Sequence, residues 1–273
     1  MFALTVSVPE RTLSEESRMH HDDLPVGRVL PRRHALGLLG MVGAALAAGT
    51  GTATASAAPN VDCVATPEMV EGPYFVDEKL RRSDIRTDPA TGKLSDGALV
   101  ALNLRVLQIA DGRCTPLPGA TVDLWHCDAV GLYSDEADAN TVGQKFLRGY
   151  QISDRGGQVR FTTILPGWYP GRTVHHHVKI RTTGTDGNAY EFTSQLYYPE
   201  QFKAAYLAKP PYAAHGTPDT TNAADQFYGT LGDQLLLNPR PHGRGHTADF
   251  TVALDLSDTK VGAPDGGRPG QPG

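Results

Sequence analysis

The sequence lacks an excess of positive charge, a long apolar run and any glycine-rich nucleotide-binding signature. Its net charge is −5 and its pI is near 6.0, so it has no polybasic face and nucleic acid is not expected as a partner. Neither a P-loop nor a dinucleotide fingerprint is present, and no internal repeat is seen. The 273 residues are 40% hydrophobic and 20% charged, which is typical of a globular chain with one domain of about 200 residues.

The apolar run nearest the N-terminus is too short to span a membrane. It extends from Ala35 to Ala48, whereas a membrane span needs about 17–25 residues. Arg32 and Arg33 precede it, and small residues follow it as far as an A-x-A cleavage signature at 55–57. The arginine pair resembles a twin-arginine export signal, although it lacks the usual preceding serine or threonine. We therefore expect an exported protein, secreted or in the cell envelope, with no stable membrane insertion after cleavage.

Cysteine is also scarce: Cys63, Cys114 and Cys127 cannot all pair with one another. One disulfide with one buried thiol fits a protein outside the cytoplasm. Cys127 falls inside a strand pattern, where a buried thiol packs as a small hydrophobe, and this favours a bond between Cys63 and Cys114. The other pairings stay open on sequence grounds.

What the sequence does contain, from about residue 98, is alternation of apolar and polar residues. Gly/Asp/Pro clusters separate the alternating segments, which are 99–109, 158–164 and 248–256. This spacing is typical of half-buried strands and predicts a mainly β protein, an antiparallel β-sandwich with long loops and a few short helices.

Helix signals are confined to three short stretches. Pro199 suits the start of a helix over 199–208, and 77–85 and 222–231 are shorter candidates. The predicted organisation is an N-terminal leader with the export signal, an extended segment packing on the core, the β-sandwich domain and a disordered Gly/Pro-rich tail, over residues 1–57, 58–97, 98–258 and 259–273.

Three consecutive histidines follow a Gly/Pro turn that also carries a tyrosine and an arginine. Because side chains alternate along a strand, His175 and His177 should project together from one face, while His176 points to the apolar side with Val178. The His-x-His pair can chelate one metal, but zinc, copper and iron sites all use it. A purely structural role for all three is the alternative.

A second cluster lies over 120–135, where a strand ends near Trp125 and a turn through Gly131 leads to Tyr133. Side chains of loop-built sites often lie at such strand ends. A core role for Trp125 and a surface role for Tyr133 are equally compatible with this segment alone.

Taken together, four blocks resemble the intradiol ring-cleavage dioxygenases, the non-haem Fe(III) enzymes that include catechol and protocatechuate 3,4-dioxygenases. The blocks occur in the family's order and spacing and cover 66–85, 116–135, 146–180 and 193–202. The resemblance implies an Fe(III) cofactor and a small aromatic diol and O2 as substrates. It implies cleavage of the ring between the two hydroxylated carbons to a muconate-type diacid. A homo-oligomer is compatible with this reading.

The resemblance also implies roles for individual residues. Two tyrosines and two histidines would bind iron, namely Tyr133, Tyr169, His175 and His177. Tyr169 would in addition take a proton from the substrate, and Arg172 and Gln195 would be catalytic. Arg172, Trp125 and Tyr74 are expected to contact the substrate. The family normally has an aliphatic residue where this sequence has His176, so the role of His176 stays open.

Two alternatives come from other classes of protein. A zinc hydrolase could use the His175 and His177 pair, but a third ligand at a familiar spacing is not evident. A secreted β-sandwich binding module would account for the fold and the export signal, but it leaves Tyr169 and Arg172 without a role. Colour separates the three hypotheses, because charge transfer from tyrosinate to Fe(III) should make the protein red-brown, whereas a zinc enzyme or a binding module would be colourless.

Overall fold

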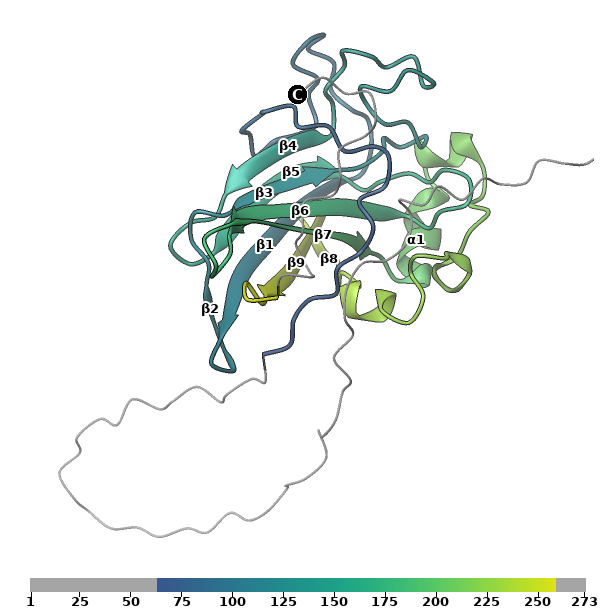
Figure 1. Cartoon of the computed structure of the whole chain (residues 1–273). Helices are drawn as coiled ribbons and strands as arrows, with labels where there is room; N and C mark the ends of the chain where they lie inside the picture. Colours follow the sequence, from purple (N-terminus) through teal and green to yellow (C-terminus); the bar gives the residue numbers. More distant parts are fainter. Residues whose placement is uncertain (1–62, 259–273) are drawn as a thin grey trace, which may run out of the picture.

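The computed structural model describes residues 63–258 (Figure 1). The predicted leader, export signal and Gly/Pro-rich tail lie outside the described residues, so these predictions and the domain bounds stay predictions. No helix within residues 63–258 is long and apolar enough to cross a membrane.

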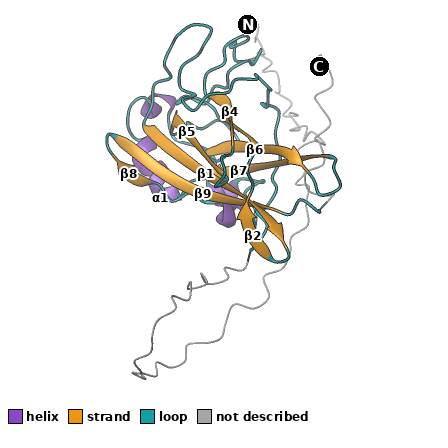
Figure 2. Ribbon diagram, turned by 90° about the vertical axis from the view of Figure 1, so that its left-hand side faces the viewer, coloured by secondary structure: helices purple, strands orange, loops and turns teal. Residues whose placement is uncertain are grey.

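Two β-sheets form a sandwich, which confirms the predicted fold class (Figures 1 and 2). In one sheet β1 lies at the centre and pairs with strands on either side, and the members are β1 (Leu99–Ala110), β2 (Arg113–Pro116), β5 (Gln158–Ile164), β8 (Arg240–His242) and β9 (Gly245–Leu254). The other has the order β4-β3-β6-β7, with bounds Arg148–Ile152, Thr121–Trp125, His175–Thr183 and Ala189–Tyr197. All pairs are antiparallel except β1 and β9, which run parallel.

Alternate residues of β1 point into the space between the sheets, as the sequence pattern predicts. Val100, Leu102, Leu104 and Val106 are each at most 1% exposed. They pack in one apolar cluster with residues from the second sheet, among them Val178. The sandwich core therefore comes directly from the two-residue period of the strands.

The one α-helix among residues 63–258, α1 (Glu200–Leu207), follows β7 and begins after Pro199, as predicted. Three short 3-10 helices come next in the chain at the same end of the sandwich (Figure 1), and their bounds are η2 (Tyr212–His215), η3 (Asn222–Ala224) and η4 (Gly232–Leu235). The helix predicted over 222–231 is therefore wrong beyond its first turn.

The helix predicted over 77–85 is also wrong. This segment runs along the sandwich and uses its backbone groups there instead of within a helix. Leu80 O accepts a hydrogen bond from Tyr150 N at 2.9 Å, and Ile85 N donates to Thr162 O at 3.1 Å.

Cys63 and Cys114 form a disulfide with Cα atoms 5.6 Å apart, and Cys127 is a buried free thiol. The favoured pairing is thus confirmed. The bond ties the start of the described chain to β2. The chain then bonds to β9 through Thr66 N and to β7 through Met69 N.

Candidate active site

The site lies at one edge of the second sheet, where three neighbouring strands bring side chains together. Trp125 of β3 pairs with His177 of β6, and His177 pairs in turn with Gln195 of β7. This register places three residues that the sequence singled out in one row across the sheet. The predicted parity of the histidines also holds, because His175 and His177 both face this cluster, with their Nε2 atoms 3.0 Å apart.

Two loop tyrosines complete the cluster. Tyr133 comes from the loop after β3, and its hydroxyl lies 3.1 Å from His177 Nε2. Tyr169 comes from the turn before β6, and its hydroxyl lies 3.1 Å from His175 Nε2. Two phenol oxygens and two imidazole nitrogens therefore converge on one place. Gly131 permits the turn before Tyr133, because its φ is +84° and a Cβ there would lie 2.2 Å from Trp168 O.

Hydrogen bonding fixes which histidine nitrogen faces the cluster. Nδ1 of His175 lies 2.6 Å from the carbonyl oxygen of Thr173, so this nitrogen carries the proton and donates it. The lone pair of His175 Nε2 therefore points toward His177 and Tyr169. An imidazole held in this way is prepared to bind a metal through Nε2.

Burial sets the charge state of these four groups. It lowers the pKa of His175 to about 3 and that of His177 well below its usual value, so both rings are neutral. Burial raises the pKa of Tyr133 and of Tyr169, while the nearby charge of Arg172 acts in the opposite direction on both. A cation bound among them would favour the phenolate forms.

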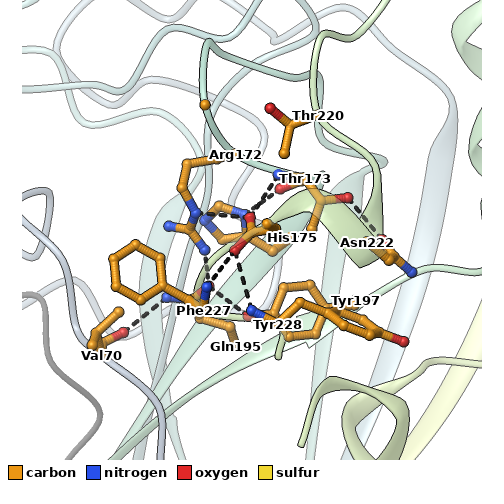
Figure 3. Close-up of polar contacts among 12 residues, drawn as sticks. Val70, Arg172, Thr173, His175, Gln195, Tyr197, Thr220, Asn222, Phe227 and Tyr228 are labelled. Carbon is orange, nitrogen blue, oxygen red and sulfur yellow. Dashed lines mark hydrogen bonds and ion pairs between the residues drawn. The ribbon is translucent and has the colours of Figure 1, made fainter. Parts of the chain in front are cut away.

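Arg172 lies beside the cluster and is held by several partners (Figure 3). Its Nε donates to Asp225 Oδ2 at 2.9 Å, and its Nη2 donates to Oε1 of Gln195. The guanidinium carbon lies 4.5 Å from the centre of the Phe227 ring. Gln195 is fixed in turn, because its Nε2 donates to Val70 O at 2.9 Å. The predicted arginine and glutamine are therefore in direct contact.

Aromatic rings form the walls of the site. Trp125 stacks on His177 with ring centres 4.7 Å apart and an interplanar angle of 8°. Tyr74 stacks on Tyr133 at 4.2 Å and meets Tyr169 edge-on at 5.9 Å. The two aromatic residues predicted to contact the substrate therefore lie against the tyrosine and histidine cluster.

His176 has a different environment, which settles the role that the sequence left open. It points to the core side of the sheet, where Nε2 lies 2.8 Å from the hydroxyl of Tyr198. The ring of His126 meets it edge-on at 4.5 Å, and His126 Nε2 lies 2.6 Å from Thr163 Oγ1. His176 is thus a hydrogen-bonded core residue, separated from the cluster by the sheet.

Sequence reasoning missed Asp225, Phe227, Phe75 and Thr173, all of which contact residues of the site. Phe75 packs on Trp125 with ring centres 4.9 Å apart. Phe75 and Thr173 lie within the sequence blocks that carried the resemblance, so their neighbours could have indicated them. Asp225 and Phe227 lie beyond those blocks, and no motif marks them.

Comparison with known proteins finds a matching family model and similar structures. Residues 70–199 match the family model described as "Dioxygenase". An intradiol ring-cleavage dioxygenase from Tetranychus urticae is similar in structure, with a TM-score of 0.63 and 28% identity, over 74% of this chain and 100% of that one. Residues 70–199 are thus similar to the intradiol ring-cleavage dioxygenases.

Two bacterial proteins are also similar to this chain. The dioxygenase domain of a dioxygenase carbohydrate-binding protein fusion from Streptomyces sp. SirexAA-E is 29% identical, with a TM-score of 0.52, over 71% of this chain and 100% of that one. Catechol 1,2-dioxygenase from Acinetobacter baylyi is 36% identical over 111 residues, which are 38% of this chain and 32% of that protein. The chain spans about a third of the length of the curated relatives it matches.

The residues present fit the Fe(III) that intradiol dioxygenases use. Metal–nitrogen bonds are about 2.0–2.1 Å long, so donors separated by 3.0–3.1 Å can share one ion. Phenol oxygen and imidazole nitrogen are ligands that suit iron. Within residues 63–258 no group of three His, Cys, Asp or Glu side chains could hold a metal, so an ion here would depend on tyrosine oxygens.

Proposed function

We propose that this protein is a non-haem Fe(III) intradiol dioxygenase that opens a catechol-type ring between its two hydroxylated carbons to give a muconate-type diacid. The observation that carries the proposal is a row of two phenol oxygens and two imidazole nitrogens, in which each atom lies 3.0–3.1 Å from the next, beside a fixed guanidinium. Both atoms of O2 enter the product, so the reaction consumes no reductant. The similarity of residues 70–199 to a dioxygenase family model supports the same reaction class.

Tyr133, Tyr169, His175 and His177 would hold the iron. When bound, Fe(III) supplies a Lewis acid that takes the substrate's oxygens and makes the ring reactive toward O2. A catechol must lose two protons to bind as a dianion, and the phenol oxygen of Tyr169 is the atom that we propose accepts one of them. Burial raises the pKa of Tyr169, so its phenolate is a strong base.

Arg172 would stabilise negative charge that develops on the ring and on the attacking oxygen. Its side chain is only 11% exposed, and a fixed charge acts more strongly in a water-poor site than in solvent. Its contacts with Asp225 and Gln195 hold the guanidinium in place, so little reorganisation is needed during the reaction.

Trp125 and Tyr74 would orient the flat substrate and exclude water. Each already stacks on a ring of the cluster, Trp125 on His177 and Tyr74 on Tyr133. Rigid aromatic walls of this kind favour a planar aromatic ring over a flexible substrate. A catechol-type diol is therefore the substrate class that we propose.

The test is oxygen uptake by iron-replete protein with catechol, protocatechuate and hydroxyquinol, together with an iron assay and a visible spectrum. We expect uptake with at least one diol and a red-brown colour. A colourless protein with no uptake would instead favour the zinc hydrolase or the binding module.

Tyr133→Phe tests the ligand assignment directly. It should bleach or shift the visible band and lower kcat by about 100-fold or more, since a bound phenolate is lost. Tyr190→Phe is the matched control, because Tyr190 is a buried tyrosine of β7 in the sandwich core whose hydroxyl has no hydrogen-bond partner. If Tyr133→Phe keeps full colour and activity, Tyr133 is not a ligand.

A further inference from the structure

Asp225 is a buried carboxylate that follows η3 and lies beside the candidate site. Its side chain is 0% exposed. Oδ2 accepts hydrogen bonds from Arg172 Nε at 2.9 Å and Thr173 N at 2.7 Å. Oδ1 accepts from Phe227 N at 2.8 Å and Tyr228 N at 3.1 Å. Burial alone would raise the pKa of Asp225, but Arg172 and Thr173 N lower it below its usual value, so the carboxylate is charged.

These contacts fix the guanidinium of Arg172 on three sides (Figure 3). Asp225 holds Nε, Gln195 holds Nη2, and the ring of Phe227 lies 4.5 Å from the guanidinium carbon. Since Phe227 N also donates to Asp225, one carboxylate positions both the cation and the ring that covers its face. Nη1 is the guanidinium nitrogen that takes no part in these contacts.

The same carboxylate reaches the metal-binding candidates through the backbone. Thr173 N donates to Asp225, and the carbonyl oxygen of Thr173 accepts the Nδ1 proton of His175. A shift of Asp225 would therefore move Arg172 and loosen the hold on His175 at once. No other described carboxylate accepts a hydrogen bond from the Arg172 guanidinium.

We propose that Asp225 is a positioning residue for Arg172. Its negative charge offsets part of the positive charge of the site, but its hydrogen bond fixes the orientation of the guanidinium. The proposal rests on the proposed function, because it assumes that Arg172 faces the reacting atoms. An unpaired arginine would present more net positive charge to a developing anion than this ion pair does. The benefit of Asp225 must then come from orientation, which acts on the transition state.

The first experiment compares Asp225→Asn with Asp123→Asn in iron-replete protein. Asp123 is a matched control, since it is also buried and accepts hydrogen bonds from an arginine, Arg181 Nε at 3.1 Å and Nη2 at 2.9 Å. We expect Asp225→Asn to lower kcat by about 10–100-fold with little change in KM, and Asp123→Asn to change kcat by less than about 3-fold. An unchanged or raised kcat in Asp225→Asn would overturn the proposal, because the charge argument alone predicts that result.

A double-mutant cycle separates positioning from a general structural effect. If Asp225 acts through Arg172, adding Asp225→Asn to Arg172→Ala should lower kcat by less than about 2-fold further. Fully additive losses would overturn the proposal. Asp225→Glu provides a second variant if Asp225→Asn does not fold. It keeps the charge and moves the carboxylate, so a wild-type kcat in Asp225→Glu would also contradict an orienting role.

Guanidinium binding gives a readout that does not depend on activity. Arg172→Ala should bind ethylguanidinium in the vacated position, as measured by isothermal titration calorimetry, and should recover part of its oxygen uptake. Asp225→Asn in the same background should weaken this binding about 10-fold or more and abolish the recovery. Equal binding with and without Asp225 would overturn the proposal. If the wild-type protein consumes no oxygen but the binding still depends on Asp225, the proposed function is wrong, whereas the positioning of the Arg172 guanidinium by Asp225 is supported.

Discussion

Opening the Cys63–Cys114 disulfide should destabilise the protein without changing its chemistry. The bond joins residues 51 positions apart in the chain. In the chain-entropy model, closing a loop of this length removes about 14 cal/mol/K from the unfolded state, which is about 4 kcal/mol at 25 °C. The bond therefore acts mainly by restricting the unfolded chain, while the folded contacts stay as they are.

Activity should survive because other contacts hold the segment that follows Cys63. Thr66 N donates to Ala253 O at 2.9 Å, and Met69 N donates to Thr193 O at 2.8 Å. Val70 O accepts a hydrogen bond from Gln195 Nε2 at 2.9 Å. These contacts tie the segment to both sheets before it reaches the site, so residues such as Tyr74 should keep their places.

The assay compares wild type with Cys63→Ala/Cys114→Ala by urea unfolding and by oxygen uptake at low temperature. We expect the free energy of unfolding to fall by about 4 kcal/mol, the m-value to rise because the unfolded chain expands, and kcat to stay within about 2-fold. Wild type in reductant should match the double variant. A fall of less than about 1 kcal/mol would refute the entropy argument, and loss of activity in the folded variant would refute the independence of the site.

Two further predictions concern pH and loop geometry. Burial lowers the pKa of His126 from 6.5 to about 3. The stability that the neutral ring contributes to the folded protein is therefore fully present above pH 6.5 and is lost as the pH falls toward 3, by about 5 kcal/mol in total. Urea unfolding between pH 8 and pH 4 should show this loss, and His126→Asn should flatten the slope. An equal slope in that variant would contradict the assignment. Gly131→Ala should lower stability by about 1–3 kcal/mol and lower iron content, because its φ is +84° and its Cβ would meet Trp168 O at 2.2 Å. Gly112→Ala, with φ +68° and nothing within 4 Å, should cost less and leave iron binding intact, and equal effects in the two variants would contradict the steric argument.

The strands, and the face of the sheet to which each histidine points, could be predicted from the sequence because both follow from one local rule. Successive side chains of a strand point to opposite faces, so Val100 and Leu102 enter the core together and His175 and His177 leave it together. The rule works without knowledge of partner strands. It does not cover 77–85, for which a helix was predicted but where the backbone instead bonds to neighbouring segments.

The hold on Arg172 could not be predicted in this way. Asp225 lies 53 residues after Arg172 and Phe227 lies two residues further on, in a stretch that has no repeating pattern. Only the path of the chain through α1 and the 3-10 helices brings them beside the site. The ligand candidates were recognisable by motif, whereas the residues that orient them were not.

Some residues of the site are held by paired strands and others by a turn, and this difference fits the chemistry that we propose. His175, His177, Gln195 and Trp125 belong to paired strands, so they can shift only if the sheet shifts. Tyr169 and Arg172 instead share one short turn, closed by a backbone hydrogen bond of 3.3 Å from Arg172 N to Tyr169 O. A tyrosine that would both hold the iron and accept a proton would need more freedom to move than the histidines. Tyr169, the tyrosine proposed as the base, is on the turn, and Asp225 holds Arg172 and Thr173 N next to it, so Tyr169 could move without changing the orientation of the guanidinium.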